Sequence, residues 1–490
     1  RKEPSQKIMN IYDTHETIIG LEVHVQLATK SKAFCSDDTT FGADPNTHIS
    51  VISLGHPGTL PKMNKKQVEF AVRLGLALNC EINPRNTFDR KNYFYADLPK
   101  GYQITQDASP ICLGGQLEIK VGEEKKTIRL HHIHMEEDAG KLIHDVDPEH
   151  SLVDLNRAGV PLLEIVTEPD FRSAEEVDVF MNAIRQLVRY LEVSDGNMEE
   201  GSLRCDCNVS VRKKGDIQLN ERCEIKNMNS MRYARQAIKF ERKRQIDLME
   251  KGERVAQNTL NFDPSTGTTS PLRQKEDAHD YRYFPEPDLP PIVLSEQYIE
   301  KIKLEMPPLP NELVDKFSIE FQLPKYDVGL LTEEKETAFF FLEICKKTNN
   351  YKAVSNLVIN KIKPYCNEVK IGISKFKVSP KSLAEFADLI EDGKVSSSIA
   401  YQRLFPALIK EPEKSPEIIA QELSLFQSND EGFLEKIVNE VLENNPKEVE
   451  AYKKGKKNLI GFFMGQVMKS SRGKAEPKST STLLRKKLEK

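Results

Sequence analysis

The spacing of apolar and polar residues divides the chain into a strand-rich part and a helix-rich part. From about residue 16 to 290, short runs with an apolar residue at every second position are separated by Gly and Pro, which is typical of β-strands. From about residue 291 onward the helical period dominates, as in residues 432–442. A Pro-rich stretch at residues 285–291 indicates a rigid linker or domain seam, and residues 411–416 indicate a second seam.

Three predicted strands carry polar residues on one face. In residues 21–27 the apolar positions alternate with Glu22, His24 and Gln26. Residues 202–212 and 223–226 repeat this alternation, which places Asp206 and Glu224 opposite an apolar face. We hypothesise that these polar faces line one shared cleft.

Composition describes a globular protein without a membrane span. The chain has 490 residues, of which 38% are apolar and 30% charged, and its net charge is −4. It contains no run of 18 or more apolar residues. The eight Cys include no C-x-x-C pair, so we predict reduced thiols and no zinc site.

Several acidic side chains are candidates for a metal site. Glu164 lies in an apolar segment, residues 162–166, where a carboxylate is costly unless it is paired or bound to a metal. Carboxylates that lie close together repel one another unless a cation separates them, and oxygen ligands suit Mg²⁺ better than zinc. Taken alone, each of the polar strand residues Glu22, His24, Glu164, Asp206 and Glu224 is more often an ordinary solvated residue. Residues 131–138 are rich in His and acidic groups and fit a polar surface strand as well as a metal site.

Known nucleotide-binding signatures are missing from the sequence. It has no G-x-x-x-x-G-K-[ST] loop, no G-x-G-x-x-G fingerprint and no kinase motif set. Use of ATP would therefore require another way of holding phosphates.

Long motifs in the first 291 residues resemble the B subunits of glutamyl-/aspartyl-tRNA amidotransferases. They are GLEVHVQL at 20–27, DRKNYFY at 89–95, LPKGYQI at 98–104, HMEEDAGK at 134–141, DLNRAGVPLLEIVTEPD at 154–170, MEEGSLRCDCN at 198–208, EIKNMNS at 224–230 and DAHDYRYFPEPDLPP at 277–291. The tail also resembles the family in GFFMGQVMK at 461–469.

The resemblance implies an α+β fold with an antiparallel-sheet cradle domain, then an all-helical domain and a small helical tail domain. We expect an N-terminal extension at residues 1–15, the cradle at 16–292, the helical domain at 293–410 and the tail at 411–490. It also implies a carbon–nitrogen ligase that takes its amide nitrogen from glutamine. ATP phosphorylates the side-chain carboxylate of Glu-tRNA(Gln), Asp-tRNA(Asn) or both, and ammonia then displaces phosphate.

The resemblance also assigns residues to this reaction. The positions that match the family's Mg²⁺ and phosphoryl-transfer site are Glu22, His24, Glu137, Glu164, Asp206 and Glu224. Lys91 and Lys100, near the aromatic residues 93–95, are candidates for the ammonia path, although a Lys beside aromatic rings is more often an ordinary contact.

Partners follow from the same resemblance. The chain lacks the Gly/Ser-rich amidase signature, so ammonia should come from an amidase-type A subunit, with a small C subunit that holds the pair together. A synthetase-like insertion is also absent, which matches the three-subunit type of the bacterial cytoplasm or of organelles.

The last 39 residues are the strongly basic part of the chain. Residues 452–490 hold 12 Lys or Arg and two Glu, a local net charge of +10. A basic terminus is often only a solvated end, but residues 461–465 are apolar and should pack. In the family this tail grips tRNA, which makes Lys469, Arg472 and Lys474 candidate contacts.

Two other functions fit a carboxylate cleft beside a basic tail. One is a metal-dependent phosphoesterase or nuclease, which would consume RNA without ATP. The other is a non-catalytic tRNA-binding scaffold, in which ATP hydrolysis would not depend on the carboxylates.

Overall fold

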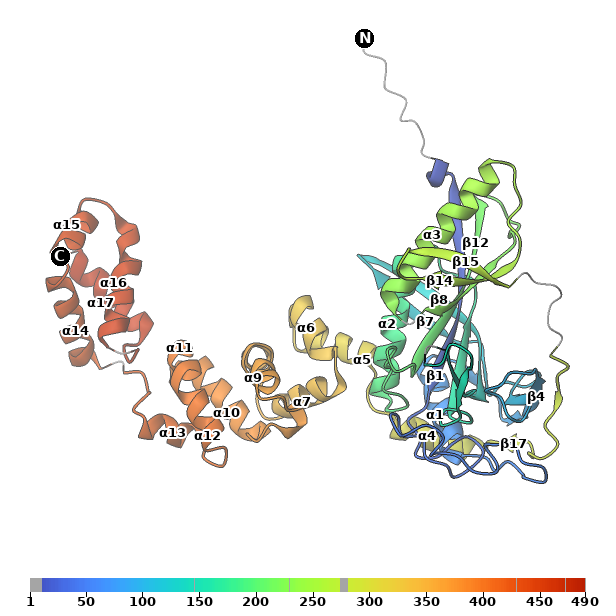
Figure 1. Ribbon diagram of the computed structural model, residues 1–490. Coiled ribbons are helices and arrows are strands. Elements are labelled where there is room, and N and C mark those ends of the chain that lie inside the picture. Colours follow the sequence, from blue (N-terminus) through green and yellow to red (C-terminus); the bar gives the residue numbers. More distant parts are fainter. Residues whose placement is uncertain are drawn as a thin grey trace, which may run out of the picture. The chain divides into compact units, whose positions relative to one another are not determined.

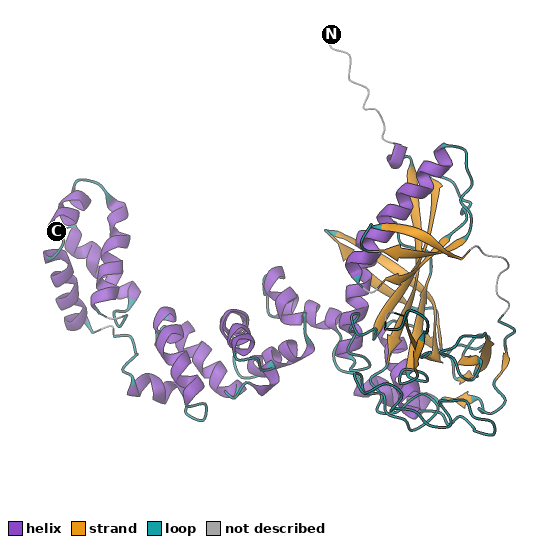
Figure 2. Ribbon diagram, in the orientation of Figure 1, coloured by secondary structure: helices purple, strands orange, loops and turns teal. Residues whose placement is uncertain are grey.

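The computed structural model describes residues 11–144, 146–228, 230–273, 281–428, 430–471 and 473–489. Contacts divide the chain into two compact units, Arg1–Leu309 and Pro310–Lys490. The first unit contains the strands and the second consists of helices, which confirms the predicted α+β class (Figures 1 and 2). No described helix is long and apolar enough to cross a membrane.

A ten-stranded sheet forms the framework of the first unit. Its strands are β1 (His15–Gln26), β2 (Glu81–Ile82), β6 (Cys112–Leu113), β7 (Gln116–Val121), β8 (Glu124–Glu137), β11 (Pro161–Thr167), β12 (Leu203–Lys213), β13 (Cys223–Met228), β14 (Asn258–Asp263) and β15 (Thr268–Arg273). Their order across the sheet is β15-β14-β13-β12-β1-β11-β8-β6-β2, and β7 pairs with β8.

One pair of strands departs from the expected antiparallel arrangement. β13 and β14 run parallel, whereas the other described pairs of this sheet are antiparallel. Parallel neighbours need a long crossover, and the 20-residue helix α3 (Met231–Glu250) supplies it. Ser230 begins this helix by accepting a hydrogen bond from the backbone N–H of Tyr233.

Helices cover one face of the sheet. α1 (Lys65–Ala77) contacts β8 and β11, α2 (Ala174–Tyr190) contacts β7, and α3 contacts β12 and β13. The apolar positions of β1 and β12 are buried against these helices in one continuous core, as their alternation predicts. The polar positions of the same strands therefore lie on the other face.

Small sheets and one further helix complete the first unit. β4 (Asp89–Asn92) lies between β5 (Tyr102–Thr105) and β16 (Phe284–Pro285), β3 (Arg85–Asn86) pairs with β17 (Ile292–Val293), β9 (Lys141–Ile143) pairs with β10 (Leu152–Asp154), α4 spans Glu296–Glu305 and a 3-10 turn spans Ile11–Asp13.

The Pro-rich stretch at 285–291 belongs to this unit. Its Glu286 is 3% exposed and pairs with Arg90, and Ile302 of α4 packs into the core. The division between the units thus lies at Leu309 and Pro310, not at the predicted residues 292 and 293. Buried side chains on both sides of the prolines hold the segment against the sheet.

The second unit consists of short helices. They are α5 (Pro310–Asp315), α6 (Lys325–Thr332), α7 (Lys335–Cys345), α8 (Tyr351–Leu357), α9 (Lys363–Glu368), α10 (Pro380–Glu391), α11 (Ser397–Ile399), α12 (Phe405–Lys410), α13 (Pro416–Glu422), α14 (Glu431–Glu443), α15 (Pro446–Lys453), α16 (Ile460–Ser470) and α17 (Pro477–Leu488). π-helical turns lie at Lys316–Glu320, Val358–Ile362 and Ala400–Leu404, and 3-10 turns at Ile373–Lys375 and Lys457–Leu459. The helices from α14 to α17 share a core of their own, centred on Val438, Phe463 and Leu484.

Candidate functional site

Strand pairing brings the predicted polar residues together on the face that the helices do not cover. In the register of β1 with β12, Glu22 lies opposite Asp206. In the register of β1 with β11, His24 lies opposite Glu164. Glu224 of β13 lies opposite Asn208 of β12, so it joins the same row. Five of the six predicted ligands are therefore gathered, in two groups.

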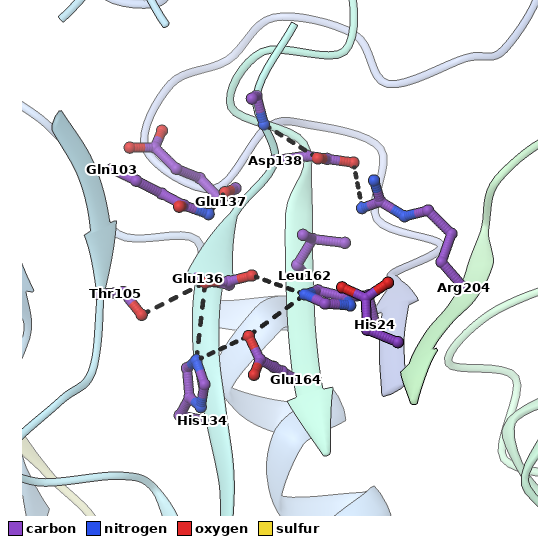
Figure 3. Close-up of polar contacts among 12 residues, drawn as sticks. His24, Gln103, Thr105, His134, Glu136, Glu137, Asp138, Leu162, Glu164 and Arg204 are labelled. Atoms are coloured by element: carbon purple, nitrogen blue, oxygen red, sulfur yellow. Dashed lines mark hydrogen bonds and ion pairs between the residues drawn. The ribbon is translucent and has the colours of Figure 1, made fainter. Parts of the chain in front are cut away.

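The first group consists of His24, Glu136 and Glu164, whose ligand atoms all lie within 4.8 Å of one another (Figure 3). Nε2 of His24 lies 3.3 Å from Glu164 and 3.8 Å from Glu136. Nε2 of His134 lies 3.5 Å from Glu164 and 3.7 Å from Glu136. Two imidazoles thus face two carboxylates in a buried position.

This pairing shifts the pKa of His24 and of Glu164. Burial opposes protonation of His24, but the nearby Glu164 and Glu136 outweigh it and raise its pKa to about 9. Burial would raise the pKa of the Glu164 carboxyl, but His134 and His24 hold it well below its usual range. A metal ion binds neutral imidazole, so an ion at His24 would displace the proton that the carboxylates now favour.

The second group consists of Glu22, Asp206 and Glu224, again with ligand atoms within 4.8 Å of one another. Burial and the charges of Glu164 and Glu224 raise the pKa of Glu22. Burial also raises the pKa of Asp206, even though Lys226 opposes this effect. Nζ of Lys226 lies 3.1 Å from Glu224 and 3.6 Å from Asp206.

Both groups have donor sets that can hold a divalent cation. The second group offers only oxygen ligands, which is the set that Mg²⁺ prefers. Burial raises the pKa of Glu22 and of Asp206, and a bound cation would stabilise their charged forms. The first group contains one nitrogen donor and so accommodates a wider range of divalent ions.

A cavity of about 230 Å³ is bordered by residues of both groups. Its wall includes His24, Glu136 and Glu164 of the first group and Asp206 of the second. Its other charged lining residues are Lys91, Asp138, Arg204 and Lys226. Cationic side chains beside carboxylates can hold an anionic phosphate group next to bound metal ions.

Arg204 is fixed in this wall by a buried carboxylate. Its Nη2 donates to Asp138 over 2.9 Å, and Asp138 also accepts from Nε2 of Gln26 over 2.7 Å. Burial would raise the pKa of Asp138, but the charges of Arg204 and Arg157 lower it. The guanidinium is therefore held in one orientation at the edge of the cavity.

Glu137 is not brought into either group. Its carboxylate accepts from the backbone N–H of Ile104 over 3.0 Å and from Nζ of Lys100. It borders a second cavity of about 240 Å³, together with Arg90, Lys100 and Tyr102. Successive side chains of a strand point to opposite faces, so Glu136 and Glu137 at the end of β8 face different cavities.

Glu136 is the member of the two candidate ligand groups that the sequence analysis did not name. The signal for it was the alternation of residues 133–136, in which Ile133 and Met135 are buried in the core. That alternation places His134 and Glu136 on the polar face. Residue type alone does not tell which of two adjacent Glu residues faces the site, whereas the alternation of side chains along the strand does.

The remaining predicted residues lie in three places. Lys91 borders the carboxylate cavity and Lys100 borders the second cavity, so the two candidates for the ammonia path are in different pockets. Lys469 is exposed near the end of α16, and Lys474 is half-buried a few residues later. Arg472 lies outside the described residues.

Comparison with known proteins identifies the family. The model of the GatB/GatE catalytic domain matches residues 17–300, and the model of the GatB domain matches residues 339–488. The chain belongs to the GatB family. This confirms the resemblance found in the sequence motifs.

Similar GatB proteins match almost the full length of the chain. The B subunit of the aspartyl/glutamyl-tRNA(Asn/Gln) amidotransferase of Thermodesulfovibrio yellowstonii is 49% identical over 470 residues, which cover 96% of this chain and 98% of the relative. The proteins of the same name from Persephonella marina and Caldicellulosiruptor bescii are 47% and 48% identical, over 96% and 97% of this chain and 98% and 99% of the relatives. GatB proteins are subunits of a tRNA-dependent amidotransferase. This enzyme is a glutamine-dependent carbon–nitrogen ligase that acts as a complex in translation.

Proposed function

We propose that this chain forms the site at which ATP phosphorylates the side-chain carboxylate of Glu-tRNA(Gln) or Asp-tRNA(Asn) and ammonia then converts it to the amide. The observation that carries this proposal is the placement of two three-residue ligand groups beside one cavity. Family membership supports the reaction class, because similar proteins are named as subunits of this amidotransferase.

The two groups have separate roles in the proposal. Glu22, Asp206 and Glu224 hold Mg²⁺, and His24, Glu136 and Glu164 hold a second divalent ion. When bound, these ions offset the charge of the ATP phosphates. Lys91, Arg204 and Lys226 border the same space and stabilise negative charge on the phosphoryl group during transfer.

The reaction consists of two substitutions. In the first, a carboxylate oxygen of the substrate forms a bond to the γ-phosphorus of ATP while the bond from that phosphorus to the bridging oxygen breaks, releasing ADP. In the second, ammonia nitrogen forms a bond to the acyl carbon and the bond from that carbon to the phosphate oxygen breaks. The phosphate leaves with one proton from ammonia, giving the neutral amide.

The second cavity provides a route for ammonia in this proposal. Lys100 and Glu137 lie in its wall, and Lys91 lies beyond them in the carboxylate cavity. Gln103 connects the two, since it borders the carboxylate cavity while its Nε2 donates to the carbonyl of Glu137. An amidase-type A subunit would release the ammonia from glutamine, and a small C subunit would hold the complex together.

The second unit binds the body of the tRNA in this proposal. Its tail carries Lys469 at the end of α16 and Lys474 in the loop before α17, and the helices of this tail share a core of their own. Bacterial relatives that match nearly the whole chain support a cytoplasmic location in a bacterium.

The test uses the complex reconstituted with A and C subunits, ATP, glutamine and both mischarged tRNAs. Asp206→Asn and Glu224→Gln each remove one ligand charge with little change in shape, so amide formation should fall to background. Asp216→Asn, an exposed residue away from the site, is the matched control and should keep full activity.

Three results would contradict the proposal. Unchanged amide formation by either site variant at saturating Mg²⁺ would remove the carboxylates from the mechanism. Consumption of RNA without ATP would favour a nuclease. ATP hydrolysis that ignores both the mischarged tRNA and the carboxylates would favour a binding scaffold.

A further inference from the structure

Four tyrosines form a continuous row that leads out of the carboxylate cavity. They are Tyr95, Tyr93, Tyr281 and Tyr283, and we call them the tyrosine array. The ring centroids of Tyr95 and Tyr93 are 5.9 Å apart, those of Tyr93 and Tyr281 are 6.0 Å apart, and those of Tyr281 and Tyr283 are 5.9 Å apart. Each pair is arranged edge to face, with interplanar angles of 66–71°.

The array connects the cavity with the surface. Tyr93 belongs to the cavity wall, whereas Tyr95 and Tyr283 are 44% and 40% exposed. Nζ of Lys91, another wall residue, lies 4.9 Å from the ring centre of Tyr281 and 6.0 Å from that of Tyr93. Aromatic surface and positive charge therefore lie together at the rim.

Backbone pairing holds the two halves of the array side by side. Phe284 and Pro285 pair with Arg90 and Asp89 of β4, and the backbone N–H of Asn92 donates to the carbonyl of Tyr281 over 2.9 Å. The hydroxyl of Tyr93 donates to Gln103 over 3.0 Å. Paired backbone segments thus hold the partly exposed rings of the rim in place.

We propose that the tyrosine array binds the unpaired 3′-terminal nucleotides of the aminoacyl-tRNA by stacking on their bases. This inference rests on the proposed function. The amino acid is esterified to the terminal ribose, so when its side-chain carboxylate occupies the cavity, the terminal base must lie at the cavity rim. The array supplies the aromatic surface at that place.

Stacking suits a site that binds unpaired nucleotides. Every base has a flat π-face, so an aromatic platform holds single-stranded nucleotides without reading their sequence. Lys91 lies close enough to place positive charge beside the backbone of the bound nucleotides. An apolar protein partner is the other candidate for these rings, but the hydroxyl-bearing tyrosines and the nearby lysine favour nucleic acid.

The test measures binding of two tRNA probes to the assembled complex. One probe is a tRNA with its complete 3′ end, and the other is the same tRNA without its 3′-terminal unpaired nucleotides. Tyr95→Ala and Tyr283→Ala each remove a rim ring, whereas Tyr95→Phe and Tyr283→Phe keep the ring and remove only the hydroxyl. Phe41→Ala, which removes another exposed ring of the same unit, is the control.

The Ala variants should bind the complete tRNA more weakly, by a factor between about 5 and about 100 for each base that loses its stacking partner. The Phe variants and Phe41→Ala should bind it as the unchanged chain does. All variants should bind the shortened tRNA equally. A loss that is the same for both probes, or no loss at all, would overturn the inference.

Two further readouts keep the interpretations apart. If the Ala variants no longer assemble with the amidase-type partner in gel filtration, the rings form a protein interface and the inference fails. If the complex without substitutions binds the complete tRNA more tightly than the shortened one, loses this difference in the Ala variants, and yet makes no amide, the inference stands while the proposed function fails.

Discussion

Two adjacent glutamates at the end of β8 allow the roles of the two cavities to be distinguished with one pair of substitutions. Glu136 lies in the wall of the carboxylate cavity with His24 and Glu164, whereas Glu137 lies in the wall of the second cavity with Lys100. Glu136→Gln and Glu137→Gln change the same charge by the same chemistry, one residue apart. We expect Glu136→Gln to remove phosphoryl transfer and Glu137→Gln to spare it.

The size of the expected effect follows from the distances in the first group. Glu136 lies 3.8 Å from Nε2 of His24, and two unit charges at that separation interact by about 4 kcal/mol at an effective dielectric constant of about 20. A cation held by the same side chains would lose an interaction of this order. Part of the loss is offset because a neutral side chain is easier to bury. A net loss of about 3–4 kcal/mol lowers the rate by about 10²–10³-fold.

The assay measures two products in the same reaction: ADP formed in the presence of mischarged tRNA, and amide formed on that tRNA. Glu136→Gln should lose both. Glu137→Gln should form ADP at close to the normal rate while glutamine-dependent amide formation falls, since its partner Lys100 lies on the proposed ammonia route. Equal losses of ADP formation in the two variants, or a loss only in Glu137→Gln, would refute this division of roles.

Three other predictions concern the partner subunits, the tail and the Asp138 network. The chain alone should release no ammonia from glutamine, and glutaminase activity in a pure preparation would contradict the need for an A subunit. Deleting residues 430–490 should weaken tRNA binding and flatten its salt dependence by about 0.9 in log–log slope for each lost phosphate contact; filter binding at several salt concentrations would contradict this if affinity and slope were unchanged. Asp138→Asn should lower the free energy of unfolding by about 3 kcal/mol at neutral pH, because it leaves Arg204 without its carboxylate. The Asp138 pKa is lowered in the fold, so this stabilisation is present above the unfolded pKa and is lost as pH falls through the folded one; denaturant titrations should show the difference from the unchanged chain shrinking in acid.

Alternation of side chains was sufficient to predict much of the sheet and of the candidate site. Most of residues 21–27 lie in β1 and most of residues 202–212 lie in β12, with the expected faces, because a period of two fixes which side chains meet the core. The parallel pair β13 and β14 was not predicted, since pairing partners depend on a crossover helix rather than on local pattern. Glu137 was chosen by motif position, whereas the alternation of residues 133–136 places Glu136 on the polar face.

The predicted domain boundaries show a different limit. Proline marks a place where the backbone stiffens, but it does not say whether the stiff segment is free or packed. Glu286 and Leu289 are buried, and Glu286 forms an ion pair with Arg90 of β4. A contact between residues nearly 200 positions apart cannot be inferred from the local composition of either segment.

The position of β8 between two cavities has a consequence for how the family can vary. One inserted or deleted residue between Ile133 and Glu136 would exchange the sides of the later side chains, turning Glu137 toward the carboxylate cavity and Glu136 toward Lys100. The same change at the hairpin tip, residues 121–124, would alter only the exposed turn between β7 and β8. Length differences among relatives should therefore occur at that tip, whereas the last residues of β8, from 133 to 137, should keep a fixed number.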